Sequence, residues 1–110
     1  MTYRSIHPQF DTTFEHFPNV PQELREGLWN YLAYGFEPGS FGMAVLCNNF
    51  ANAVCRAHPA LTLASLRDMA KWLMHHAPKE SYGNFDKVQE WKIKTNQERL
   101  DIMIAVGLRP

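Results

Sequence analysis

The sequence predicts an all-α fold, a compact single domain of four to five helices with an extended aromatic N-terminal arm. Three observations support this prediction. The length of 110 residues suits one domain. Apolar residues recur at intervals of three and four along several stretches, and Pro, Gly and capping residues separate these stretches. We place the arm at residues 1–20 and the helical domain at residues 21–110.

The N-terminal arm, MTYRSIHPQFDTTFEHFPNV, mixes aromatic side chains with Pro8 and Pro18 and shows no sustained period. We expect it to be extended, and either to pack onto the body of the domain or to cross to a neighbouring subunit. Disorder is less consistent with so many aromatic side chains, which would then lie in water. The side chains expected to pack are Ile6, Phe10, Phe14 and Phe17.

The first helix is predicted from about residue 20 to Tyr34. Asn19 suits its N-cap, and Pro21 falls near the first turn, where a missing N–H is tolerated. Gly35 follows in the position where a left-handed C-cap is usual. An apolar stripe recurs every four residues at Val20, Leu24, Leu28 and Leu32.

A second helix is predicted from Ser40, its natural N-cap, to about Ala57, and Pro59 ends it. Its apolar residues cover most of its circumference, so we expect it to be the central and most buried element. These residues are Phe41, Ala44, Val45, Leu46, Phe50, Ala53 and Val54.

A third helix is predicted to begin after Thr62, as its cap, and to end before Pro78. Its spacing predicts that one apolar stripe faces inward, made of Leu63, Leu66, Ala70 and Leu73.

The fourth element is predicted to begin at Asn84, with Phe85, Val88 and Trp91 on one side. The segment from Thr95 to Glu98 has the spacing of a capping box. The element is therefore either one long helix or two short helices broken near Thr95. The last apolar run, LDIMIAVGL, should dock onto the domain.

Composition excludes several classes of function. Eleven basic residues balance eleven acidic ones, which argues against a general nucleic-acid binder. No stretch approaches the ~18 apolar residues that span a bilayer, and the N-terminus lacks the order of a secretory signal. We therefore expect no nucleic-acid partner, no membrane partner and a reducing cytoplasm.

Candidate catalytic and metal-binding residues are few. Cys47 and Cys55 lie eight residues apart, a rise of ~12 Å on one helix, which is too far for a disulfide. We expect both to be buried, inert thiols. His75 and His76 are adjacent, so on a helix they point in different directions and cannot easily share an ion. With no convergent nucleophile, base and acid, the sequence predicts no metal, no cofactor and no enzyme.

The loop GFEPGSF before the predicted second helix is the first candidate binding site. Pro38 fixes one backbone angle, Gly39 permits an unusual one, and Ser40 supplies a capping oxygen next to Phe41. The free N–H groups of a first helical turn favour a phosphate. A rigid turn between antiparallel helices explains the same residues, and no Gly-Lys-Ser/Thr of a P-loop follows.

A polar stripe on the predicted second helix is the second candidate. Asn48, Asn52 and Arg56 fall at positions i, i+4 and i+8, with Asn49 beside them. Amides and a guanidinium recognise base edges, riboses and phosphates. The alternative is that these residues form the solvated side of the helix.

Trp29 is the third candidate because it lies off the inward stripe of the predicted first helix. A contact in the core or between subunits is one use for such a residue. Stacking on a nucleotide base is the other.

The segment LWNYLAYGFEPGSFGMAVLCNNFANAVCRAHP resembles small accessory proteins of tailed bacteriophages, a family of unsettled function. The pattern is G-x-x-P-G-x-F followed by A-V-L-x-N, and the likeness covers about residues 28–92. The matching residues are Tyr31, Gly35, Pro38, Gly39, Phe41, Ala44, Val45, Leu46 and Asn48. Asn49 stands where the family pattern has an acidic residue.

The resemblance implies a protein of the infected host cytoplasm that acts by binding. Joined to the candidate residues, it predicts a homo-oligomeric sponge that sequesters a nucleotide-derived signal of host immunity. The predicted ligand-binding residues are Pro38, Gly39, Ser40, Phe41, Asn48, Asn52, Arg56 and Trp29. The alternative is an inhibitor of a host protein, or a virion accessory factor, that acts through an aromatic surface without a small ligand.

Overall fold

The computed structural model describes residues 7–56 and 62–108, without the side chains of Phe50 and Arg56. These ranges are helical throughout, with connecting turns and no strand, as predicted for an all-α fold. The α-helices are α1 (Pro8–Asp11), α2 (Gln22–Tyr34), α3 (Ser40–Leu46), α4 (Phe50–Arg56), α5 (Leu63–His76), α6 (Phe85–Ile93) and α7 (Asn96–Ala105). Two 3₁₀ turns also occur: η1 (Thr12–Phe14) lies between α1 and α2, and η2 (Lys79–Ser81) lies between α5 and α6.

The predicted number of four to five helices is too low, since the described ranges hold seven. Two breaks, at the second and fourth elements, and the unpredicted helix α1 account for the difference. Asn48 takes a left-handed backbone conformation, with φ of 60°, and divides the predicted second helix into α3 and α4. Thr95 forms its capping box with Glu98, so the fourth element is two helices, α6 and α7.

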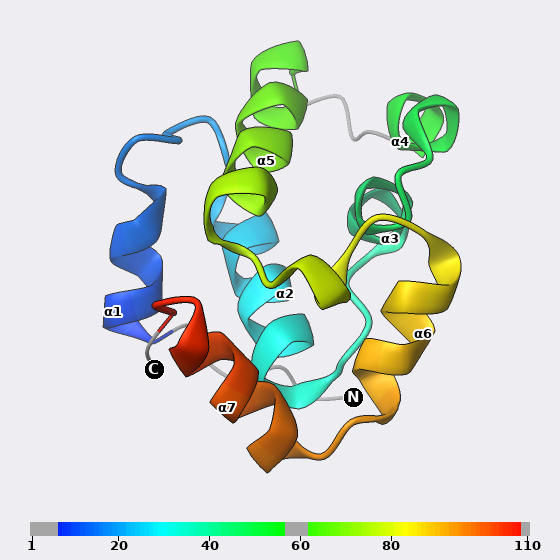
Figure 1. The fold of residues 1–110 in the computed structure, drawn as a ribbon. Coiled ribbons are helices and arrows are strands. Elements are labelled where there is room, and N and C mark those ends of the chain that lie inside the picture. The colour runs from blue at the N-terminus through cyan, green and yellow to red at the C-terminus, as the bar shows by residue number, and fades with distance from the viewer. Residues whose placement is uncertain (1–6, 57–61, 109–110) are drawn as a thin grey trace.

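Helix α2 lies in the middle of the molecule (Figure 1), with α1, α3, α5, α6 and α7 arranged around it. Five consecutive residues of α2, from Leu28 to Leu32, are buried. The predicted second helix is therefore not the central element. Gly35 ends α2 in the left-handed conformation, as the sequence predicted. Pro21 occupies the N-cap position that was predicted for Asn19, which instead hydrogen-bonds to Asp68 on α5.

The N-terminal segment belongs to the core. Phe10, Phe14 and Phe17 are buried, as predicted, but residues 8–14 are helical and not extended. The Phe14 ring stacks on the Trp72 ring of α5 with centroids 4.6 Å apart. The Trp72 Nε1 donates a hydrogen bond to Thr13 Oγ1 at 2.9 Å. Ile6 lies outside the described residues.

The C-terminal run docks as predicted. Met103 and Leu108 are buried, and the Leu108 N–H donates to the Met103 carbonyl at 2.8 Å. This bond closes the end of α7 over Gly107, whose φ is +88°.

Candidate functional site

An open cavity of about 560 Å³ lies between α5 on one side and the joint of α3 and α4 on the other. We call it the groove. Its volume falls within the range of ligand sites in proteins, roughly 300–1,000 Å³. The groove is mainly apolar, and its lining residues are Val45, Asn48, Asn49, Ala53, Leu63, Leu66, Arg67, Ala70, Leu73, Met74, Tyr82 and Gly83.

Helix α5 forms one wall of the groove with an apolar stripe that the core covers only in part. The stripe contains the four residues predicted to face inward, of which only Leu73 is fully buried. Leu63 is 77% exposed and Met74, at the other end of the stripe, is 73% exposed. The core side of α5 is made instead by Ser65, Met69, Trp72 and Leu73. The prediction that the whole stripe packs inward is therefore wrong.

Helix α5 has two apolar faces, one toward the core and one toward the groove, and both follow from its sequence. Apolar or small residues occupy so many of its positions that two faces of the helix are apolar at once. The aromatic cluster around Trp72 takes one face, because it offers the larger buried surface. The second face is left at the groove.

The opposite wall is the joint between α3 and α4, and three asparagines build it. Asn48 N–H donates to the Val45 carbonyl and Asn49 N–H to the Ala44 carbonyl, at 3.0 and 2.8 Å, which is a Schellman cap of α3. The Asn49 Oδ1 then accepts from the Asn52 N–H at 3.2 Å and caps α4. These residues therefore end one helix and begin the next.

The turn after η2 forms the end of the groove. Gly83 has a φ of +123° and donates its N–H to the Leu46 carbonyl of α3 at 2.8 Å. The Tyr31 hydroxyl of α2 donates to the Ser81 carbonyl at 2.6 Å, and burial raises the pKa of that hydroxyl. The turn that presents Tyr82 is thus held against both α2 and α3.

Among the described residues that line the groove, Arg67 is the only charged one. It is exposed, and no salt bridge joins it to another residue within the described ranges. The neighbouring acid, Asp68, accepts hydrogen bonds from the backbone and side chain of Asn19, on the other side of the helix. The groove therefore offers an apolar surface with one available cation.

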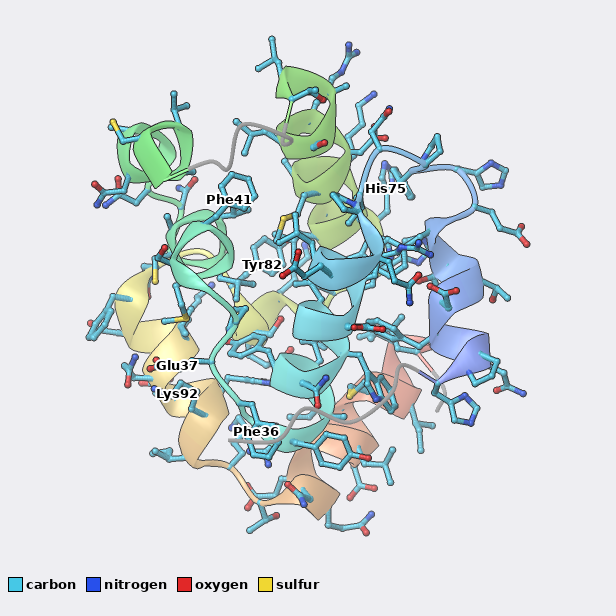
Figure 2. All side chains as sticks on the ribbon, turned by 180° about the vertical axis from the view of Figure 1, so that it is seen from behind. Phe36, Glu37, Phe41, His75, Tyr82 and Lys92 are labelled. Carbon is cyan, nitrogen blue, oxygen red and sulfur yellow. The ribbon has the colours of Figure 1, made fainter. Side chains whose placement is uncertain are left out.

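The loop before α3 is more closely packed than the sequence predicted. Pro38 is buried, and a Cβ placed on Gly42 would lie 2.9 Å from the Pro38 Cβ. Glu37 forms a salt bridge with Lys92 of α6, and Figure 2 shows the two side chains together. Gly39 is the N-cap of α3, so the prediction of Ser40 as the N-cap is wrong.

Most of the predicted ligand-binding residues lie outside the groove. Among those whose side chains the structure describes, Asn48 alone lines it. Gly39 and Ser40 are exposed at the start of α3, while Pro38 and Phe41 are buried. Asn52 is exposed on α4, and the Arg56 side chain lies outside the described residues. The break at Asn48 also means that no single helix carries the predicted polar stripe.

Trp29 is in the core, only 4% exposed. Its ring lies 5.1 Å from the Phe10 ring and 6.1 Å from the Tyr34 ring, centroid to centroid. This agrees with the core use proposed for an off-stripe tryptophan, and it leaves the ring no face for a nucleotide base.

The cysteines differ from the prediction that both are buried. Cys47 is half-buried and Cys55 is exposed, and both are free. Burial, and then the nearby charge of Glu37, raise the pKa of the Cys47 thiol, which disfavours the reactive thiolate. No group of three metal-ligating side chains occurs among the described residues.

Sequence reasoning missed Arg67, Met74, Tyr82 and Gly83. The signal for the α5 wall was present in the spacing of its apolar residues, but periodicity alone does not say which of two partners a stripe faces. The turn at Tyr82 and Gly83 carries no pattern of its own, since tertiary contacts bring it to the groove.

Comparisons with protein-family models, with curated proteins and with solved structures gave no match. No described helix has the length and apolar character needed to span a bilayer.

Proposed function

We propose that this chain is a non-enzymatic binding protein whose groove holds the apolar face of a helix from a partner protein. The observation that carries the proposal is that both ends of the apolar stripe of α5 are uncovered. Leu63 and Met74 lie in that stripe, both more than two-thirds exposed, at the edge of a cavity of about 560 Å³.

A helix fits this surface better than a small polar ligand does. Leu63 and Met74 are eleven residues apart, which is about 16 Å along α5, or three helical turns. Peptide-binding grooves of this kind take apolar side chains at helical spacing, and methionine adapts to different partners. Burial of one such side chain contributes roughly 1.5–3 kcal/mol.

The resemblance to small accessory proteins of tailed bacteriophages supports the same class of function. Such a protein would bind a partner in the host cytoplasm or a component of the virion. The proposal therefore corresponds to the alternative predicted from the sequence, an inhibitor of a host protein or a virion accessory factor. The difference is that the described lining of the groove is mainly aliphatic, with Tyr82 as its one aromatic residue.

Sequestration of a nucleotide-derived signal remains a prediction. The groove does not favour it, because a nucleotide needs several polar and cationic groups and the lining offers Arg67 and the two asparagines of the α3–α4 joint. Calorimetry against cyclic dinucleotides and ADP-ribose derivatives tests it directly. A ligand present at 100 times its Kd should add about 2.7 kcal/mol to the stability of the protein.

The groove is tested with a labelled helical peptide that carries leucines at positions i, i+3 and i+7 and neutral polar residues elsewhere. Fluorescence anisotropy should show binding to the wild-type protein and a loss of at least tenfold in affinity for Met74→Glu. Ile93→Glu is the matched control, because Ile93 is 83% exposed on α6 and does not line the groove. Equal affinity for both variants, or no binding to any of them, would refute the proposal.

A further inference from the structure

We propose that the partner helix carries acidic residues beside its apolar stripe, and that Arg67 selects it by pairing with one of them. This inference rests on the proposed function and names the chemistry of the partner.

The position of Arg67 is the first support. Leu63, Arg67, Ala70 and Met74 follow one another at spacings of four, three and four residues along α5, so they share one face of the helix. Arg67 therefore lies within the apolar stripe, between its two exposed ends. A helix that covers Leu63 and Met74 must pass the guanidinium.

The charges around the groove are the second support. No acidic residue occurs in the part of its lining that the structure describes, and Asp68 is hydrogen-bonded to Asn19. A basic partner would therefore meet a cation with no local compensation. An acidic partner would gain an ion pair that the apolar surroundings partly shield from water.

Arginine also suits this role better than a flexible ammonium group. Its planar guanidinium can bind both oxygens of one carboxylate while its apolar stem covers the neighbouring leucines. The amide of Asn48 on the opposite wall is exposed and can meet the polar flank of the same helix.

The experiment uses two peptides with the same leucine stripe, one with glutamates and one with lysines flanking it, titrated into the full chain. The wild type should bind the acidic peptide about fivefold more tightly than the basic one, as expected for one exposed ion pair. The preference should weaken as salt is added. Arg67→Glu should reverse the preference.

Lys94→Glu is the matched control, because Lys94 lies at the end of α6 and does not line the groove. It should keep the preference of the wild type. Because Lys94→Glu and Arg67→Glu change the net charge equally, a reversal in both would assign the effect to overall charge and overturn the inference.

The outcomes also separate the inference from the proposed function. If the two peptides bind equally well and Met74→Glu abolishes the binding of both, the role of Arg67 is refuted but the groove is still a site for a helix. Binding of neither peptide would refute both. Sedimentation that shows a dimer dissociated by Met74→Glu would identify a second copy of this chain as the occupant, and would overturn the inference.

Discussion

Among the charged side chains that the structure describes, Arg99 is the most fully enclosed, at 3% exposed. Its guanidinium donates to the carbonyls of Trp91, Lys92 and Lys94 at the end of α6, and its Nε donates to the Ala33 carbonyl of α2 at 3.4 Å. Burial lowers the pKa of this guanidinium, but an arginine stays charged at neutral pH. One cation therefore satisfies the carbonyl groups left over at two helix ends.

Replacing Arg99 by methionine should lower the free energy of unfolding by about 3 kcal/mol, because several buried carbonyls lose a charged donor. Urea unfolding followed by tryptophan fluorescence measures this change. Lys71→Met is the control at an exposed site of α5 and should change stability by no more than about 0.5 kcal/mol. Similar values for the two variants would show that the Arg99 contacts contribute little.

His76 links stability to pH. Its ring lies 5.8 Å from the Trp72 ring and 5.9 Å from the Phe17 ring. Burial, and then the charges of His75 and His16, lower its pKa below the ordinary value. The folded state thus favours the neutral ring, while the unfolded chain takes up a proton near pH ~6.5.

Stability should therefore fall as the pH is lowered through ~6.5 toward the folded-state pKa of His76, since the unfolded state binds more protons in that window. Urea midpoints at pH 7.5 and 5.5 measure the slope. His76→Gln should reduce the difference between the two midpoints. An unchanged difference would assign the pH dependence to other groups.

Among the elements, helix ends decide the path of the chain more than helix interiors do. Gly35 turns the chain from α2 into the loop that leads to α3, with a φ of +72°. A Cβ placed there would lie 2.9 Å from an Arg99 nitrogen and 3.0 Å from the Lys92 carbonyl oxygen. This position thus excludes side chains both by backbone conformation and by lack of space.

Three glycine-to-alanine variants separate these two effects. Gly35→Ala should cost roughly 1–3 kcal/mol from strain and contact together. Gly107→Ala should cost less, because φ is +88° there but no described residue beyond its chain neighbours lies within 4 Å of the added Cβ. Gly39→Ala should be close to neutral, since φ is −58° and the space is open. Thermal unfolding of the three variants would contradict this order if Gly39→Ala were the most damaging.

In the molecule as a whole, the N-terminal segment is part of the core and not an arm apart from the domain. The rings of Phe10 and Phe14 lie against Trp72 at 5.4 and 4.6 Å between centroids. Phe10 also contacts Trp29 of α2. The N-terminal segment thus joins α2 to α5 within the same chain, and the core is incomplete without it.

Phe10→Ala should lower the free energy of unfolding by about 3–5 kcal/mol, because it leaves a cavity among large rings. That is a large part of the total stability of a small domain. Chemical unfolding should show a single transition that moves to lower denaturant. Thr12→Ala is the control, since Thr12 is exposed in the same segment. A transition of unchanged midpoint for Phe10→Ala would show that the segment is a separate unit.

Local chemistry explains which predictions from sequence hold. The caps at Thr62, Asn84 and Thr95 and the C-cap at Gly35 are confirmed, because a cap depends on residues only a few positions apart. The caps predicted at Asn19 and Ser40 are wrong: Asn19 bonds to Asp68 of α5 instead, and Gly39 is the N-cap of α3. The break at Asn48 was not predicted. The apolar residues on both sides of it continue a helical period, and a left-handed asparagine has no periodic signal.

The candidate site was less predictable. The sequence identified the asparagines and the stripe of α5, but it placed the asparagines on one helix edge and the stripe in the core. To assign either correctly, one must know which face of each helix is turned toward the core. That orientation depends on residues far apart in the chain, such as Phe14 and Trp72.

The sequence by itself determined the all-α class, several helix boundaries and the packing of Phe10, Phe14 and Phe17 onto the domain, since these follow from periodicity, caps and burial. Only the tertiary structure decided that α2 is central, that the N-terminal segment completes the core and that one apolar face of α5 stays open. The reason is competition: α5 has two apolar faces, and the aromatic cluster covers one of them. The face that remains is the one available for binding.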